Sequence, residues 1–246
     1  MGRQARQLSE SGFYHILLRG INRQHIFEEE SDYTYFLKDF HNLKTDLAFA
    51  VYAYCLMSNH VHLLLREKQA GDISLIMKRL LTKYAMYFNR KYQRNGALIA
   101  NRYKSVPVEV DEYFIPLLRY IHQNPLKAGL VDKLEAYPFS SYREYLSGGE
   151  LTDTAFAFEL IGREEWIGLH QVMTVDEFDI SGKLSINDGE IRRRIMNFTN
   201  GREPHEIGSW TKAERDFMLR ELKQAGLSIR QIERATGISR GVVAKS

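Results

Sequence analysis

The sequence is poor in cysteine and in long apolar runs. Its one cysteine, Cys55, can neither close an internal disulfide nor build a thiolate metal site by itself, which suits a reducing compartment. No apolar run approaches the roughly 20 residues that a membrane-spanning helix needs. The N-terminal stretch MGRQARQLSESG is polar and basic and lacks the apolar core of a signal peptide. We therefore expect a cytoplasmic protein that does not insert into a membrane.

Acidic residues are missing from one long interval, because none occurs between Asp72 and Glu109. The formal net charge of the whole chain is only +3, so the imbalance is local. Tyrosine and phenylalanine alternate with the basic residues there, and such rings can stack on unpaired bases while basic groups neutralise phosphates. A solvated helix face above core tyrosines is the alternative. We predict nucleic-acid contact through the basic residues of this interval: Lys78, Arg79, Lys83, Arg90, Lys91, Arg94, Arg102 and Lys104.

The composition is that of an ordinary globular protein, with 44% hydrophobic and 26% charged residues in a chain of 246. This length allows one large domain or two small ones. The Ser-Gly-Gly sequence that ends at Gly149 marks a plausible boundary. We expect a first domain over residues 1–149, a weakly patterned connecting region over 150–187 with one or two short helices, and a helical region over 188–246.

The periodicity of the first domain predicts alternating strands and helices. Short runs rich in β-forming residues indicate strands at about 13–19, 48–57, 59–66 and 102–110, with Pro107 favouring an edge position for the last. Apolar residues at helical spacing indicate helices at about 31–46, 72–92 and 115–124. The order β-α-β-β-α-β-α predicts an α+β fold of the split βαβ type, an antiparallel sheet covered on one face by helices.

Two histidines follow the Ser-Asn turn of the stretch MSNHVHLLLRE, residues 57–67. Because residues i and i+2 of a strand face the same side, His60 and His62 should stand together on one face, with Val61 and Leu63 on the other. Neutral imidazole is the commonest side-chain ligand of divalent metals. A pair of hydrogen-bonded histidines with no metal is the alternative, and spacing alone does not decide between them.

The third predicted helix carries Tyr120 and Asn124, which are four residues apart and so lie on one helix face. Pro116 suggests an irregular first turn, and Pro125 should end the helix at Asn124, because proline disfavours helical backbone in the preceding residue. An amide oxygen could be a third metal ligand, and a tyrosine hydroxyl could be a nucleophile. By residue type alone, a core tyrosine on an amphipathic helix is the simpler explanation of Tyr120.

The end of the chain has the spacing of a helix-turn-helix. A helix over about 210–225 starts with a Thr211–Glu214 capping box, and a second helix, the turn Gly237–Ser239 and a helix from Arg240 follow. We predict that this region contacts DNA, with Arg230 and Arg240 among its contacts. Any small helical bundle would share this pattern. The chain ends at Ser246, about two turns into the last helix, which leaves open whether the module is complete.

Four segments together resemble the REP-associated tyrosine transposases, an IS200-like family within the single-tyrosine HUH endonuclease superfamily. The resemblance covers about residues 12–146 and is specific because the motifs occur in order. The segments are YHILLRGINRQHIF, LMSNHVHLLL, RYIHQNPLKAGLV and YPFSSYREYL. The resemblance implies a ferredoxin-like fold, metal binding by His60 and His62, a nucleophilic Tyr120 and Asn124 as the residue that completes the metal site.

The resemblance also implies a reaction. Members of the family cut single-stranded DNA at or beside hairpins and keep a 5′-phosphotyrosine link, which allows strand rejoining without ATP. Two histidines and one amide leave open coordination positions, so Mg²⁺ or Mn²⁺ is a better expectation than structural Zn²⁺. Tyr103 and Tyr113 compete as nucleophiles by residue type, but neither stands before the Asn-Pro pair. We expect DNA as partner and a monomer or homodimer.

Two other classes of protein remain compatible with these residues. One is a catalytically silent DNA-binding regulator that keeps the fold, and the other is a metal-dependent hydrolase that activates water. The joint presence of His60, His62, Tyr120 and Asn124 argues against the first. A covalent protein–DNA adduct would separate the transposase from both alternatives.

Overall fold

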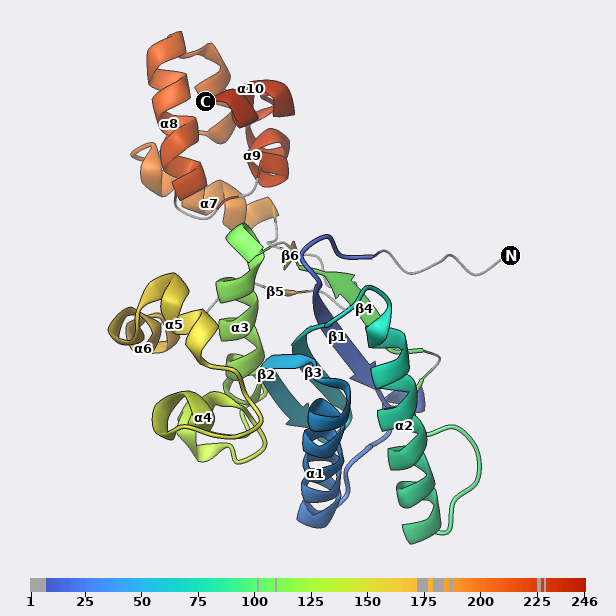
Figure 1. The fold of residues 1–246 in the computed structure, drawn as a ribbon. Coiled ribbons are helices and arrows are strands. Elements are labelled where there is room, and N and C mark those ends of the chain that lie inside the picture. Colours follow the sequence, from blue (N-terminus) through green and yellow to red (C-terminus); the bar gives the residue numbers. More distant parts are fainter. Residues whose placement is uncertain are drawn as a thin grey trace, which may run out of the picture. The chain divides into compact units, whose positions relative to one another are not determined.

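The computed structural model divides into two compact units, Met1–Thr174 with Phe178–Lys183, and Val175–Glu177 with Leu184–Ser246 (Figure 1). The structure describes residues 8–100, 102–108, 110–171, 177–178, 184–185, 188–224, 227 and 229–246. Within these ranges, no helix combines the length and the apolar character that crossing a bilayer requires.

The first unit is built on a four-stranded antiparallel sheet in the order β2-β3-β1-β4. The four predicted strands and the α+β class are confirmed, although the last strand is shorter than expected. Pro107 lies in β4 at an edge of the sheet, as predicted, because its missing N–H is not needed by a further strand. The strands are β1 (Phe13–Arg19), β2 (Ala50–Met57), β3 (His60–Arg66) and β4 (Lys104–Pro107).

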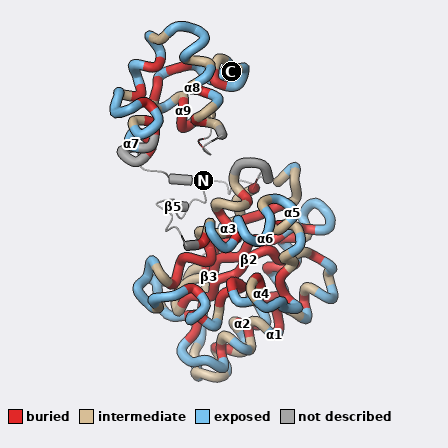
Figure 2. The backbone as a smooth tube through the Cα atoms, turned by 90° about the vertical axis from the view of Figure 1, so that its left-hand side faces the viewer, coloured by how far each residue is buried: buried red, intermediate tan, exposed pale blue. Residues whose placement is uncertain are grey.

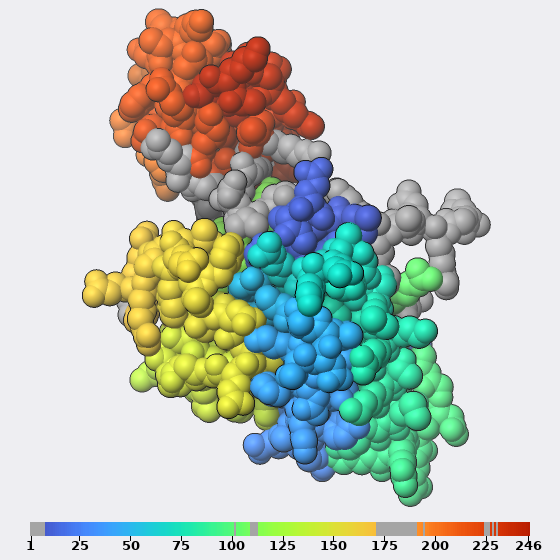
Figure 3. All heavy atoms as spheres, in the orientation of Figure 1, coloured from blue at the N-terminus to red at the C-terminus, as the bar shows by residue number. Residues whose placement is uncertain are grey.

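Two long helices, α1 (Glu30–Leu47) and α2 (Asp72–Lys91), cover one face of this sheet. Figure 3 shows them side by side on this side of the molecule. Their apolar stripes, which include the fully buried Phe40 and Leu80, pack on alternate strand residues such as Ile16 and Leu63. The period of two along each strand therefore directs these residues to the large core and their neighbours to the opposite face.

The opposite face is covered by α3 (Val110–Lys127), so the expectation of helices on one face only is wrong. The Phe13 and Phe114 ring centroids lie 5.5 Å apart, and Tyr52 packs on Phe114 at 5.3 Å. Figure 2 shows the strands β2 and β3 buried over most of their length. Both faces of β2 carry apolar or aromatic side chains, and such a strand must be covered on both sides.

Helix α3 contains both Pro116 and Pro125 and continues to Lys127, whereas we expected it to end at Asn124. Pro125 lacks the N–H that would pair with the carbonyl of Ile121. The Asn124 side-chain amide donates to the carbonyl of Tyr120 at 2.8 Å and lies 3.5 Å from the carbonyl of Ile121. This local donor offsets the missing backbone bond and lets the helix run on for one more turn.

Residues 150–171 belong to the first unit, so the boundary predicted at residue 149 does not coincide with the division of the structure. They form two short helices, in agreement with the weak pattern. Trp166 is fully buried and stacks on Tyr145, with ring centroids 4.7 Å apart. Here the elements are α4 (Tyr142–Ser147), α5 (Ala155–Ile161), α6 (Arg163–Gln171) and the 3-10 helix Leu134–Ala136; another 3-10 helix, Ile21–Arg23, follows β1.

A buried chain of hydrogen bonds joins α6 to α3. His170 Nδ1 lies 2.8 Å from the carbonyl of Trp166, which can only accept, so this nitrogen carries the proton. His170 Nε2 then accepts from His122 Nδ1 at 3.0 Å, and His122 Nε2 accepts from the Ser141 hydroxyl at 2.8 Å. Both imidazoles are therefore used as neutral groups, and His122 is turned away from the face of α3 that carries Tyr120.

This chain predicts acid sensitivity. Burial lowers the pKa of His170 to about 4 and the pKa of His122 well below 6.5. Below about pH 6.5 these histidines bind protons in the unfolded chain but stay neutral in the folded state. The free energy of unfolding therefore falls toward pH 4, by about 1.4 kcal/mol per pH unit for each histidine. Urea unfolding at about pH 7.5 and pH 5.5 measures this loss. His170→Gln should reduce the loss, the exposed-site variant His25→Asn should not, and equal stability at both pH values would contradict the assignment.

Two fragments test whether α5 and α6 are part of the stable fold of the first unit. A fragment 1–174 should fold like the first unit, whereas a fragment 1–150 loses the buried Trp166 and uncovers Tyr145 and His122. Removing one large buried aromatic costs about 3 kcal/mol or more, which lowers the melting temperature by roughly 10 °C in a unit of this size. Thermal melts followed by circular dichroism compare the two fragments. Identical melting curves would place α5 and α6 outside the stable fold.

The second unit is a small helical assembly with its own core, which includes Ile195, Leu219 and Ile232. The predicted capping box is present: the Glu214 carboxylate accepts from the N–H of Thr211 at 3.2 Å, and the Glu214 N–H donates to the Thr211 hydroxyl at 3.4 Å. Gly226 and Ser228, expected at helix ends, lie outside the described residues. The helices are α7 (Asp188–Phe198), the 3-10 helix Pro204–Ser209, α8 (Lys212–Gln224), α9 (Ile229–Thr236) and α10 (Arg240–Lys245); a two-stranded sheet pairs β5 (Glu177–Phe178) with β6 (Leu184–Ser185).

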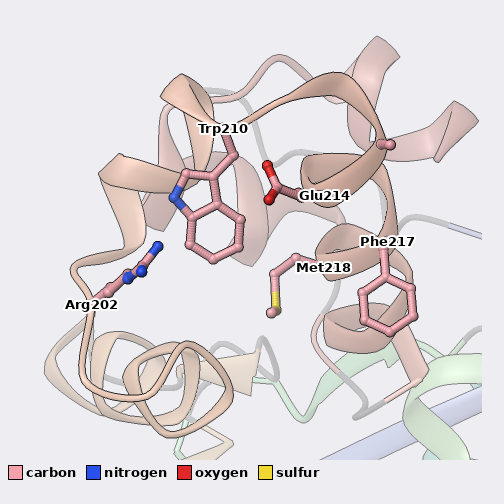
Figure 4. Close-up of a pocket in the computed structure, with 6 residues that line it drawn as sticks. Arg202, Trp210, Glu214, Phe217 and Met218 are labelled. Atoms are coloured by element: carbon pink, nitrogen blue, oxygen red, sulfur yellow. The ribbon is translucent and has the colours of Figure 1, made fainter.

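An open pocket lies on the α8 side of this unit (Figure 4). The Arg202 guanidinium lies 5.6 Å from the Trp210 ring centroid, and Phe217 is 57% exposed. Glu214 and Met218 complete the labelled lining residues. The predicted helix-turn-helix uses α9 and α10, so this pocket is separate from the surface that the sequence singled out.

Candidate active site and metal centre

His60 and His62 both lie on β3, on the sheet face that α3 covers. Their ring centroids are 5.1 Å apart, and Val61 and Leu63 point into the opposite core, as predicted. His62 is 3% exposed, whereas His60 is only partly buried at the beginning of the strand. The strand thus places one buried imidazole and one partly exposed imidazole on the same face of the sheet.

Each imidazole is oriented by a partner on its Nδ1 atom. His60 Nδ1 lies 2.7 Å from Asn59 Oδ1, and because that oxygen only accepts, Nδ1 carries the proton. His62 Nδ1 lies 3.0 Å from Nε2 of His15, a buried residue of β1. Partners of this kind fix the ring orientation of metal-binding histidines and leave Nε2 free to coordinate.

Both histidines are held in the neutral form that a metal ligand requires. Burial, reinforced by the charge of Arg19, lowers the pKa of His60 to about 4. Burial also lowers the pKa of His62 well below 6.5, with His15, His60 and Arg19 adding to the effect. At neutral pH neither ring has to lose a proton before binding a cation.

Helix α3 places Tyr120 and Asn124 at the same site. The Tyr120 ring centroid lies 5.5 Å from that of His62. The Asn124 amide N–H donates to the backbone carbonyl of Tyr120, and the Asn124 side chain also hydrogen-bonds to His60. Because the N–H is engaged by the helix, the amide oxygen is the Asn124 atom that could coordinate a metal. Lys127 Nζ lies 4.9 Å from the Tyr120 ring centroid, so a positive charge accompanies the phenol.

The two competing tyrosines lie elsewhere. Tyr103 is 8% exposed and belongs to the core between the sheet and the helices α1 and α2, on the far side from His62. Tyr113 lies seven residues before Tyr120, roughly 10 Å along the helix axis. Of the three tyrosines, Tyr120 is the one in ring contact with the histidine pair.

The donor set fits a hard divalent cation. His60, His62 and the Asn124 amide supply two nitrogens and one oxygen, with coordination positions to spare for water and phosphate. Among the described residues, no group of three or more His, Cys, Asp or Glu side chains is placed to hold a metal. A site here therefore depends on the Asn124 oxygen as its third protein ligand.

The basic interval lies mainly on α2, which covers the opposite face of the sheet from the histidine pair. Several of its charges are satisfied within the first unit: Arg79 pairs with Asp46, Lys83 with Asp39, Lys91 with Asp32 and Glu29, and Arg94 donates to Gln24. Lys78, Arg90, Arg102 and Lys104 are exposed. Contact of this interval with nucleic acid stays a prediction, and its paired members have a structural role that the sequence did not reveal.

Lys91 provides a test of that structural role. Its Nζ lies 2.6 Å from Oδ1 of Asp32, a carboxylate that is fully buried. Lys91→Ala removes the counter-charge and should lower the free energy of unfolding by about 2 kcal/mol. The exposed control Lys78→Ala should change it by less than about 0.5 kcal/mol. Urea unfolding compares the variants, and equal losses would mean that the Lys91 ion pair carries little of the stability.

The predicted contacts in the helix-turn-helix are only partly described. Arg240 begins α10 and pairs with Glu233 of α9. Arg230 lies in α9, and its side chain is outside the described part of the chain. The segment α9, turn and α10 has the expected order, while DNA contact by these residues stays a prediction.

Sequence analysis missed His15 and Arg19, which belong to the first motif of the resemblance. Strand β1 pairs with β3 so that Arg19 stands opposite His60 and Leu17 opposite His62. His15 and Arg19 are four residues apart on one strand, so the strand period of two places them on the same face, and this period was the available signal. The register that brings them to the histidine pair depends on pairing between distant segments and is not readable locally.

Comparison with known proteins points to one family. Residues 9–124, which contain His60, His62, Tyr120 and Asn124, match the family model described as IS200-like transposase. A Haemophilus influenzae protein provisionally named as a REP-associated tyrosine transposase is 28% identical over 104 residues, covering 38% of this chain and 59% of that protein. A solved REP-associated tyrosine transposase bound to a REP hairpin has a TM-score of 0.50 at 19% identity, covering 60% of this chain and 86% of that one. The last likeness supports the fold.

Proposed function

We propose, from the match of residues 9–124 to the model of the IS200-like transposase family, that the protein cleaves and rejoins single-stranded, hairpin-containing DNA through a 5′-phosphotyrosine intermediate. The observation that carries the proposal is the meeting of Tyr120 with His62 and of Asn124 with His60 on the α3 face of the sheet. The named nucleophile is Tyr120, and the metal ligands are His60, His62 and Asn124.

In the proposed step the Tyr120 oxygen attacks the scissile phosphorus while the bond to the 3′-oxygen breaks. The 5′-phosphate becomes joined to Tyr120, the other strand end leaves as a 3′-hydroxyl, and the phenol proton is released. A bound Mg²⁺ or Mn²⁺ supplies charge stabilisation for the phosphate oxygens. Because the phosphotyrosine keeps the energy of the broken ester, a second 3′-hydroxyl can reverse the reaction and join strands.

The residues of this chain have distinct tasks in that step. An ordinary phenol has a pKa of about 10 and is a weak nucleophile at neutral pH, so Tyr120 depends on placement and on nearby positive charge. The α3 helix supplies the placement, and Lys127 supplies one positive charge near the ring. Asn59 holds His60 in the tautomer that coordinates through Nε2, and His15 fixes the orientation of the His62 ring.

DNA is the proposed partner. The solved relative is bound to a REP hairpin, and we extend a hairpin partner to this chain as part of the proposal. The second unit would add affinity or target choice through α9 and α10, while the chemistry stays in the first unit. The protein would act as a monomer or homodimer.

The test is incubation of the protein with end-labelled single strands that contain hairpins, in the presence of Mn²⁺, followed by a denaturing gel. We expect a labelled product of protein size that EDTA prevents and protease digestion removes. Cleavage without such a product would support a water-using hydrolase. Binding with neither cleavage nor adduct would support the second candidate, a catalytically silent DNA-binding regulator, for which the capped helices of the second unit are the favouring observation.

A further inference from the structure

Arg19 stands at the edge of the histidine pair. It is the last residue of β1, and the antiparallel register places it directly opposite His60, two residues beyond the pair Leu17 and His62. Directly opposite residues on neighbouring strands project to the same face, with Cβ atoms about 5 Å apart. The Arg19 side chain therefore leaves the sheet on the face that carries His62 and Tyr120.

The backbone around Arg19 is held on both sides. Its carbonyl accepts from the N–H of Ala100 at 2.7 Å, and the next N–H, that of Gly20, donates to the carbonyl of Asn59 at 2.9 Å. A Cβ on Gly20 would lie 2.1 Å from the carbonyl oxygen of Gln24, so this position excludes any larger residue. Hydrogen bonds thus tie the end of β1 to the turn before His60 and fix the backbone position of Arg19.

Arg19 is a partly buried basic residue without an acidic partner among the described residues. By contrast, Arg79, Lys83 and Lys91 are each paired with a carboxylate. A half-buried guanidinium without a counter-ion is costly, which suggests that its partner is a ligand.

The surroundings of Arg19 indicate the charge of that ligand. The guanidinium is always protonated, and its position directly opposite His60 places the field of a positive charge beside the two histidines. The same field repels a cation bound by these histidines. In the free protein, the positive charge of Arg19 therefore disfavours metal binding. An anion bound between Arg19 and the metal would remove this conflict, because a phosphodiester is attracted to both positive groups.

We propose that Arg19 contacts a non-bridging oxygen of the phosphodiester that is presented to Tyr120. This inference rests on the proposed function, since it assigns a substrate contact at the same site. The planar guanidinium can donate two parallel hydrogen bonds to a phosphate and offset the charge that builds on it. Arg19 cannot act as a base, so its role is binding and charge stabilisation.

The test separates metal binding from strand binding. In a Tyr120→Phe background, which prevents turnover, Mn²⁺ affinity is measured by calorimetry without DNA. Binding of single-stranded oligothymidylate is then measured by fluorescence anisotropy with Mn²⁺ present. The variants are Arg19→Gln, Arg19→Lys and the matched control Arg66→Gln, which changes an exposed arginine on the same face of β3 near the far end of the sheet.

For Arg19→Gln we expect strand affinity to fall about tenfold, since a charge-assisted hydrogen bond is lost, while Mn²⁺ affinity stays equal or rises. Arg19→Lys should recover part of the strand affinity, and Arg66→Gln should bind like the parent. Strand affinity of Arg19→Gln equal to that of Arg66→Gln would overturn the assignment, as would a parallel fall in Mn²⁺ affinity. These binding measurements do not depend on cleavage. The absence of an adduct with the wild-type protein would therefore refute the proposed function, while the phosphate contact of Arg19 is tested separately by strand affinity.

Discussion

Replacing Tyr120 by phenylalanine is expected to remove the covalent protein–DNA product completely. The change deletes one oxygen, the atom that would attack phosphorus, and keeps the ring that packs against His62 and His15. Loss of the hydroxyl's hydrogen bonding costs about 1 kcal/mol, so the melting temperature should fall by only about 2–4 °C. Binding of single strands should stay close to that of the wild type. Denaturing gels with hairpin substrates and Mn²⁺ measure the adduct.

Tyr113→Phe is the matched control, because it makes the same chemical change on the same helix roughly 10 Å away. It should leave the adduct intact. An adduct that persists in Tyr120→Phe and disappears in Tyr113→Phe would move the nucleophile to Tyr113. Cleaved DNA without an adduct in Tyr120→Phe would show that water can reach the scissile phosphate once the phenol oxygen is gone.

The second large effect is expected from His60→Ala. Removing a first ligand from a site with only three protein donors should weaken Mn²⁺ binding at least about a hundredfold, and cleavage should be lost with it. His60 is partly exposed and Val61 and Leu63, its neighbours in the core, are untouched, so the fold should be retained. Calorimetric Mn²⁺ titration and thermal melts measure the two properties. His25→Ala, a change at an exposed histidine, is the control.

His62→Ala should also abolish metal binding, but at a higher cost to the fold than His60→Ala. His62 is 3% exposed, and its Nδ1 is the hydrogen-bond partner of the buried His15. The variant leaves a cavity and removes that bond, which together cost about 2–3 kcal/mol. A His62→Ala protein as stable as His60→Ala would contradict the buried imidazole pair. Mn²⁺ affinity equal to wild type in both variants would overturn the metal site.

Local sequence determined the elements and the chemistry they carry. The alternation of apolar residues predicted the strands and the common face of His60 and His62, because the period of a strand is a property of neighbouring residues. Spacing by four predicted that Tyr120 and Asn124 share a face of α3, and the Thr211–Glu214 capping box marked the start of α8. Each of these features depends on residues within one turn or one strand.

Tertiary structure decided what these elements do together. The register of β1 against β3 brings Arg19 and His15 to the histidine pair. Helix α2 packs on the other face of the sheet and is therefore separated from that pair. Helix α6 is joined to α3 of the first unit through His170. Ion pairing with the buried Asp32 gives Lys91, a predicted DNA contact, a structural role as well. Such features arise from contacts between residues dozens of positions apart, and their energy depends on packing and pairing that no local pattern records.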